Sequence, residues 1–176
     1  NYALSYKTGV YDFDVSMEVS YTNGCTDTVS ISINIQASPS ASFIVNNACE
    51  GANVVIQNNS TIVNPFSLVN HYWVYGDGTF ANNPSIAKQY NSYGNFTILL
   101  VETGSNGCSD STQQTVTIYP KPQLSWTIGP ACQYTYTEFT NNSTVAVGNI
   151  TNTDWVVNLQ FPFSSSSASY LFLTTG

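Results

Sequence analysis

The sequence contains very little charge. Only 7% of its 176 residues are charged, three of them lysine and none arginine, and the formal net charge is −7. An average soluble protein has about 25% charged residues. So few cations cannot neutralise a phosphate backbone, and we therefore expect no nucleic-acid partner. No stretch approaches the ~20 apolar residues of a membrane-spanning helix, so we expect no membrane insertion by this segment.

Helical periodicity is also missing, because no stretch of about ten residues repeats its apolar positions every 3.6 residues. Hydrophobic residues nevertheless make up 42% of the chain and aromatic residues 14%. Between residues 29 and 35 the sequence alternates strictly, with Val29, Ile31, Ile33 and Ile35 on one face and Ser30, Ser32 and Asn34 on the other. This period of two is typical of a strand with one buried face. The composition predicts an all-β fold.

Several short motifs recur at one constant spacing of ~83 residues, which indicates a tandem array. Asn-Gly-Cys-Thr-Asp at 23–27 returns as Asn-Gly-Cys-Ser-Asp at 106–110, Ala-Cys at 48–49 returns at 131–132, and Asn-Asn-Ser-Thr at 58–61 returns at 141–144. A looser match joins the two ends, where Tyr2–Gly9 resembles Tyr170–Gly176. We therefore expect the C-terminal strands of a first Ig-like module at 1–38, a complete module at 39–121, and the N-terminal part of a third module at 122–176. We call this constant spacing one repeat.

The complete module should contain about seven short strands. The pattern places them at 40–45, 53–57, 71–75, 86–90, 95–102 and 112–119, with further short segments between them. So many short strands in one repeat predict an Ig-like β-sandwich. Prolines at 37–40 and 119–122 predict stiff junctions between modules. The apolar faces of the two incomplete end segments should be exposed.

One group of motifs resembles the PKD (polycystic kidney disease) domain. The segment 73–79 reads Trp-Val-Tyr-Gly-Asp-Gly-Thr, and Asn83-Pro84, Tyr90 and Gly94-Asn95-Phe96 follow it. The family pattern has Phe where Tyr75 stands and His where Gln89 stands. The third module retains only Trp155 of this pattern. The resemblance implies that residues 39–121 form a PKD-type sandwich.

The Asn-Gly-Cys ending, paired with an early cysteine, is similar to repeats in giant cell-surface proteins of Bacteroidota. These include the gliding-motility adhesins of the SprB type, which leave the cell by type IX secretion. The resemblance implies an extracellular, surface-bound filament or adhesin stalk. Its partners would be the neighbouring modules, with lateral self-association and surface polysaccharide as further partners.

Four cysteines occupy repeat-related positions: Cys25, Cys49, Cys108 and Cys132. An even number in a chain of secreted character indicates disulfides. In an Ig-type sandwich Cys49 and Cys108 would lie at opposite ends, ~25–30 Å apart, whereas a disulfide needs Cα atoms within ~7 Å. A staple between successive modules therefore explains them best, with an intra-module bond and free thiols as the alternatives. No Cys-x₂-Cys spacing suggests a metal site.

Two further kinds of position are candidate sites. Thr28 and Ser111 each follow an aspartate in a tripeptide that resembles the O-glycosylation signal of exported Bacteroidota proteins. The alternative is that they are ordinary polar residues at the start of a strand. The Gly76-Asp77-Gly78 segment predicts a structural turn in which Asp77 accepts hydrogen bonds from nearby amides. A structural calcium ligand is the alternative there, and we expect no other cofactor.

No arrangement of residues points to catalysis. His71 is the only histidine and lies in no catalytic motif, so we do not expect an enzyme. Trp73, Trp126 and Trp155 fall in expected strands and should be core or sheet-face aromatics. The sequence predicts a structural stalk that provides length and stiffness for attachment or motility. The alternative is a carbohydrate-binding accessory module of a secreted enzyme.

Overall fold

The computed structural model describes residues 6–7, 10–82, 86–157 and 163–173, and all regular elements within these ranges are β-strands. The chain divides into two compact units. The first comprises residues 1–48, 53–89 and 95–117, and the second comprises residues 49–52, 90–94 and 118–176. Within the described ranges, no helix is long and apolar enough to cross a membrane.

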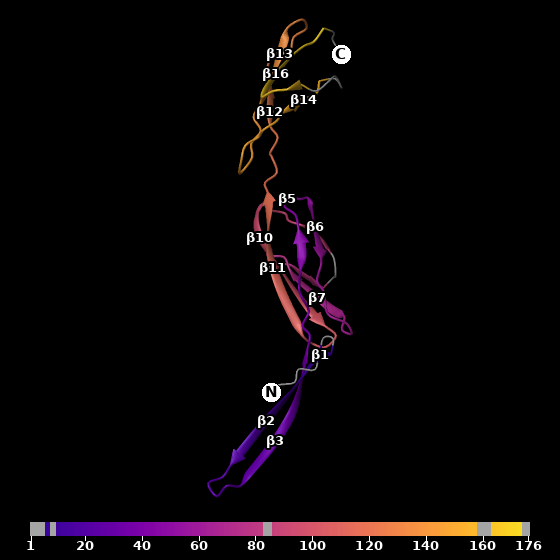
Figure 1. Cartoon of the computed structure of the whole chain (residues 1–176). Coiled ribbons are helices and arrows are strands. Elements are labelled where there is room, and N and C mark those ends of the chain that lie inside the picture. Colours follow the sequence, from indigo (N-terminus) through magenta and orange to yellow (C-terminus); the bar gives the residue numbers. More distant parts are fainter. Residues whose placement is uncertain (1–5, 8–9, 83–85, 158–162, 174–176) are drawn as a thin grey trace. The chain divides into compact units, whose positions relative to one another are not determined.

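The N-terminal segment is an antiparallel hairpin with a short third strand. The strands are β1 (Tyr6–Lys7), β2 (Val10–Ser20) and β3 (Thr26–Gln36), in the order β1-β2-β3 (Figure 1). The turn between β2 and β3 contains Gly24, whose φ of 89° lies in the left-handed region that favours glycine. We call residues 10–36 the N-terminal hairpin.

The central module, residues 39–119, is a β-sandwich. Its strands are β4 (Phe43–Val45), β5 (Ala48–Cys49), β6 (Asn53–Asn58), β7 (Leu68–Val74), β8 (Phe80–Asn82), β9 (Ile86–Gln89), β10 (Gly94–Gly104) and β11 (Ser109–Tyr119). They form a five-stranded sheet in the order β5-β11-β10-β7-β8 and a three-stranded sheet in the order β4-β6-β9. The predicted all-β, Ig-like sandwich is confirmed.

Inward-facing side chains of both sheets form the core of the central module. The fully buried apolar residues include Phe43, Val54, Ile56, Trp73, Ile98, Leu100, Val116 and Ile118. The rings of Phe43 and Trp73 meet edge to face with centroids 5.2 Å apart, and this contact joins β4 of one sheet to β7 of the other. Burying each such large side chain contributes about 1.5–3 kcal/mol, so the two-sheet core accounts for the stability of the module.

Residues 122–173, which we call the C-terminal half-module, form two small sheets. β12 (Trp126–Ile128), β13 (Tyr136–Asn141) and β16 (Ser167–Leu171) form one, and β14 (Asp154–Trp155) and β15 (Phe163–Ser164) form the other. Among its described residues the most deeply buried are Thr137, Phe139 and Ala168.

Several strand boundaries differ from the prediction. The first strand is shorter than 40–45 and begins at Phe43, after an isolated bridge between Ser40 and Thr61. β7 begins at Leu68, before the expected start at residue 71. β8 was not predicted, because so short a strand cannot show a period of two. The Asn83-Pro84 element lies outside the described residues, as does part of the match between 2–9 and 170–176.

Candidate interaction surfaces

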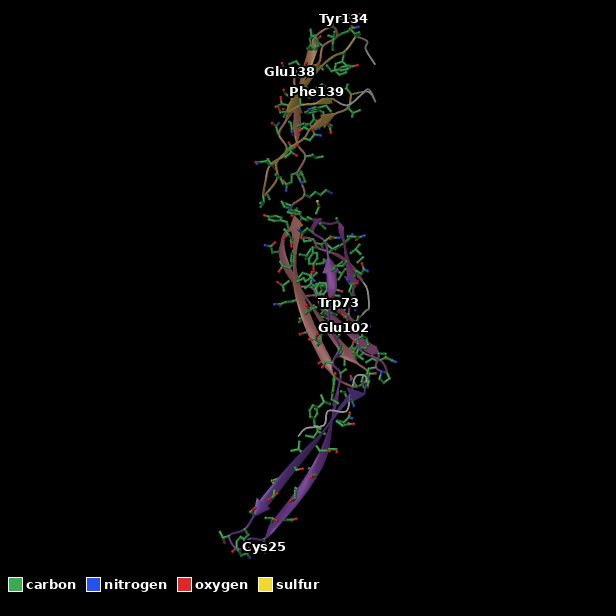
Figure 2. The ribbon with its side chains drawn as sticks, viewed as in Figure 1. Cys25, Trp73, Glu102, Tyr134, Glu138 and Phe139 are labelled. Atoms are coloured by element: carbon green, nitrogen blue, oxygen red, sulfur yellow. The ribbon has the colours of Figure 1, made fainter. Side chains whose placement is uncertain are left out.

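A buried polar network lies inside the central module. Glu102, on β10, has no exposed surface, and its carboxylate accepts a hydrogen bond of 2.6 Å from the Asn58 side-chain amide and pairs with His71 Nδ1 at 2.7 Å. Figure 2 shows Glu102 near Trp73 within this module. A buried carboxylate is tolerated only when it is paired and hydrogen-bonded. The only histidine of the chain therefore has a structural role that its sequence context did not reveal.

The Gly76-Asp77-Gly78 segment forms a hydrogen-bonded turn. Asp77 Oδ1 accepts hydrogen bonds from the amide and the hydroxyl of Thr79 at 3.0 and 2.6 Å, and Asp77 Oδ2 pairs with Lys88 Nζ at 2.6 Å. A Cβ at Gly76 would lie 2.7 Å from the Thr97 carbonyl oxygen, so only glycine fits there.

The ionisation of Asp77 reflects these contacts. Partial burial disfavours its charged form, but the hydrogen bonds from Lys88 and Thr79 and the Lys88 charge outweigh burial and hold the pKa of Asp77 below its ordinary value. Burial, reinforced by the nearby Asp77 charge, raises the pKa of Tyr75. The Asp77 carboxylate already has a lysine partner, and among the described residues no group of three His, Cys, Asp or Glu side chains is placed to hold a metal ion.

All four cysteines are free thiols in the structure. Cys25 lies in the turn of the N-terminal hairpin, as Figure 2 shows, and Cys49 and Cys132 are exposed. The predicted staple between modules needs partners in other modules, so it stays a prediction. Thr28 and Ser111 are both exposed on their strands, β3 and β11, so their hydroxyls are accessible to a modifying enzyme.

The two long hairpins have the same turn, one repeat apart. In the first, the Tyr21 amide donates to the Cys25 carbonyl at 2.8 Å and the Gly24 amide donates to the Tyr21 carbonyl at 2.9 Å. In the second, the Gly104 amide donates to the Cys108 carbonyl and the Gly107 amide to the Gly104 carbonyl, both at 2.9 Å. The first and last residues of β3 and β11 also correspond when the chain is shifted by one repeat. The turn of the N-terminal hairpin and the bounds of β3 therefore match the turn between β10 and β11 and the bounds of β11.

The strand pairings of the C-terminal half-module resemble those of β4, β6 and β9 in the central module. β4 pairs with β6 in the register Phe43↔Asn58, and β12 pairs with β13 in the register Trp126↔Asn141, again one repeat later. The Thr61 amide donates to the Ser40 carbonyl at 3.0 Å, and the Thr144 amide donates to the Gln123 carbonyl at the same distance. The half-module thus reproduces β4 and β6, and β16 pairs with β13 as β9 pairs with β6.

Two apolar surfaces of the chain are exposed. The first is one face of the N-terminal hairpin, where directly paired residues are apolar: Tyr11 and Ile35, Phe13 and Ile33, Val15 and Ile31, and Met17 and Val29. Its opposite face is polar, with Asp12 opposite Asn34 and Ser16 opposite Ser30. Contiguous apolar surface of this kind marks an interaction site or a sheet face that another element covers.

The second surface is an aromatic groove in the C-terminal half-module. Trp126, Phe139 and Trp155 have ring centroids 5.7–6.1 Å apart and line a hollow of about 350 Å³. Trp126 is 56% exposed. Trp126 and Trp155 meet edge to face, as Phe43 and Trp73 do in the central module. Of the two predicted roles for the tryptophans, Trp126 and Trp155 are sheet-face aromatics that line this groove, and Trp73 is a core residue.

Comparison with known proteins supports the fold of the central module. The family model of the PKD domain matches residues 36–119. Residues 36–119 thus form a PKD-like module of the Ig type.

Solved structures similar to the chain include two bacterial PKD domains. One is the PKD1 domain of Vibrio anguillarum Epp, with 25% identity and a TM-score of 0.42 over 46% of this chain and 93% of that one. Another is the PKD1 domain from the Vibrio cholerae metalloprotease PrtV, with 28% identity and a TM-score of 0.42 over 46% of this chain and 96% of that one.

A third similar structure comes from work on carbohydrate-binding modules of the β-sandwich superfamily, with 18% identity and a TM-score of 0.46 over 58% of this chain and 54% of that one. No curated protein matches the sequence significantly.

Proposed function

We propose that this chain is a structural segment of a secreted cell-surface protein, in which PKD-like modules provide length and stiffness for attachment or motility, and that it has no catalytic activity. The central observation is the set of matching turns and strand registers one repeat apart. These matches support the proposal that successive copies of one structural unit follow each other in the chain. A strand of 11 residues such as β10 spans about 36 Å, so each further module would add on the order of 30–40 Å.

The interior of the central module supports a mechanical role. Its core is apolar, and its one buried carboxylate is bonded to Asn58 and His71. The Asp77 carboxylate is likewise paired with Lys88. These polar side chains bond to one another and stabilise the module.

A test is to express arrays of one, two and three copies of the repeat and to measure their maximum dimension by small-angle X-ray scattering. A stalk predicts that the dimension increases by a constant step with each copy. A maximum dimension that stays constant, or that grows irregularly because modules fold back on one another, would contradict the proposal. Intact mass of native protein would test glycans at Thr28 and Ser111, and non-reducing peptide mapping would test the predicted disulfides.

The aromatic groove favours a second function, the binding of surface polysaccharide by an accessory module. Trp126 and Trp155 present ring surface of the kind on which sugars stack. Co-sedimentation with insoluble polysaccharides, compared between the natural chain and Trp126→Ala, tests this function. If the polysaccharide retains the unsubstituted chain but not the variant, this function is supported. If it retains both equally, the groove is not the binding site.

A further inference from the structure

The N-terminal hairpin and the C-terminal half-module are the two complementary parts of one sandwich. The N-terminal hairpin reproduces β10 and β11, and the C-terminal half-module reproduces β4, β6, β7 and β9 by their registers and contacts. Among the described residues, each segment has the strands that the other does not. The central module contains both parts and shows how they fit together.

In the central module, β10 pairs with β7 so that Leu100 lies opposite Trp73 and Glu102 lies opposite His71. The core residues that β10 and β11 contribute include Ile98, Leu100, Val116 and Ile118. The residues one repeat earlier are Val15, Met17, Ile33 and Ile35, and these are 43–60% exposed. The N-terminal hairpin therefore presents the same kind of inward face as β10 and β11, but that face is in contact with solvent.

The polar groups of the two parts also match. At the position of buried Glu102 the N-terminal hairpin has Val19. Trp155 follows Trp73 by 82 residues, one fewer than the repeat, so Thr153 stands at the position of His71 in the C-terminal half-module. The Thr153 hydroxyl accepts a hydrogen bond of 2.9 Å from the side-chain amide of Asn141.

This hydrogen bond gives the Asn141 side-chain amide a partner without a carboxylate. Asn58, the equivalent of Asn141, instead donates to Glu102. An incoming strand with a glutamate at this position would bury an unpaired charge against Thr153, whereas a strand with a valine would not. The half-module is thus suited to the N-terminal hairpin and not to a strand like β10.

We propose that the N-terminal hairpin of one copy of this chain docks onto the C-terminal half-module of a second copy, with β2 adding to the exposed edge of β14. The register of the central module places Met17 opposite Trp155 and Val19 opposite Thr153 of the second copy. Docking covers the aromatic groove and completes a sandwich. Because the two surfaces differ, the contact is head to tail, and a docked copy keeps its other surface for a further copy. This inference goes beyond the proposed function.

The unsubstituted 176-residue chain tests this association directly. Its monomer mass is 19.1 kDa. In sedimentation velocity over a rising concentration series, we expect the average mass to pass through two copies and continue to increase. A mass of one copy throughout, or a plateau at two, would overturn open-ended association.

Two variants test the proposed register. Val19→Glu places a carboxylate opposite Thr153 of the second copy, and we expect association to weaken about 100-fold because the charge is buried without a partner. Ser20→Glu is the matched control, since it adds the same charge at the next residue on the polar face, and it should associate like the natural chain. Circular dichroism should show that both variants retain the strand content of the natural chain, since both positions are exposed in a single copy.

A third variant provides a specific rescue. Combining Val19→Glu with Thr153→His rebuilds, across two copies, the arrangement of Glu102, His71 and Asn58, and it should restore most of the lost affinity. Nonspecific adhesion between apolar faces would show no such rescue. Equal effects of Val19→Glu and Ser20→Glu, or no recovery in the double variant, would overturn the register. A chain that stays monomeric and binds polysaccharide through Trp126 would assign the groove to a sugar and not to a second copy.

Discussion

The central module and the C-terminal half-module share strand registers but differ in burial. Trp73 is fully buried in the central module, whereas its counterpart Trp155 and the adjacent Trp126 line an open groove. The pairing of β4 with β6 and of β12 with β13 has the same register in the two regions, so this pairing does not cause the difference. The difference lies in β10 and β11, the long strands that continue the sheet of β7 in the central module. A strand pair therefore forms from local pattern, but a closed core requires the rest of its sheet.

Replacing each of the two equivalent tryptophans by alanine should give the largest difference in lost stability between the two regions. We expect Trp73→Ala to destabilise the central module by about 3–5 kcal/mol, because it leaves a large cavity in a closed core. Trp155→Ala should cost about 1 kcal/mol, because solvent can fill the space that the ring leaves. Hydrogen exchange of peptides covering β6 and β13 measures the two regions separately. Similar losses of protection in both would contradict the comparison.

The buried network should be sensitive to the removal of one partner and tolerant of coordinated change. Glu102→Val leaves Asn58 and His71 facing an apolar side chain, and we expect a loss of about 3–4 kcal/mol. Adding His71→Thr recreates the pairing of Asn141 with Thr153 and should recover a large part of this loss. Urea unfolding of the single and double variants measures the recovery. A double variant less stable than Glu102→Val alone would show that the two arrangements are not interchangeable.

A reciprocal exchange on β6 and β13 tests a smaller difference. Val54 and Thr137 occupy equivalent, fully buried positions, but the Thr137 hydroxyl has no hydrogen-bond partner among the described residues. Thr137→Val should stabilise the C-terminal half-module by about 1 kcal/mol, and Val54→Thr should destabilise the central module by about 1–3 kcal/mol. Denaturant unfolding gives both values. If Thr137→Val is destabilising, the hydroxyl makes a bond that the comparison has missed.

The smallest expected effect concerns the Asp77 turn and its dependence on pH. Because the folded-state pKa of Asp77 is lowered, its contribution to stability is present above the ordinary aspartate pKa and is lost as the pH falls through the folded-state value. Below pH ~4 we expect the central module to lose about 0.5–1 kcal/mol through this group. Asp77→Asn should remove this part of the acid dependence. Denaturant unfolding of the unsubstituted chain and the variant across this pH range measures the effect. If both lose the same free energy of unfolding as the pH falls, Asp77 is not the group responsible.

Much of the fold could be predicted from the sequence because it depends on local pattern. The alternation in 29–35 predicts β3, and the Asn-Gly-Cys motif recurs at two hairpin turns in which Gly24 and Gly107 have positive φ angles. The Trp-Val-Tyr-Gly-Asp-Gly-Thr motif predicts the β7 turn. β8 could not be predicted, because its few residues pair with β7 only when the intervening turn has folded.

The polar network was the main feature that the sequence did not reveal. Asn58, His71 and Glu102 lie on three strands and are up to 44 residues apart, so no motif connects them. A single glutamate on the apolar face of a long strand was the one available signal. Its meaning depends on which residues of the facing sheet lie opposite it.

By itself, the sequence determined the strand class, the spacing of the repeat, the turn chemistry and the weak overall charge, because each of these depends on neighbouring residues or on composition. Only the tertiary structure decided which tryptophan is core and which lines a groove, which acidic residue is buried, and which apolar strand face remains exposed. These properties arise when two sheets meet, and the meeting brings together side chains far apart in the chain. Equivalent aromatic positions therefore form a closed core at Phe43 and Trp73 and an open groove at Trp126 and Trp155.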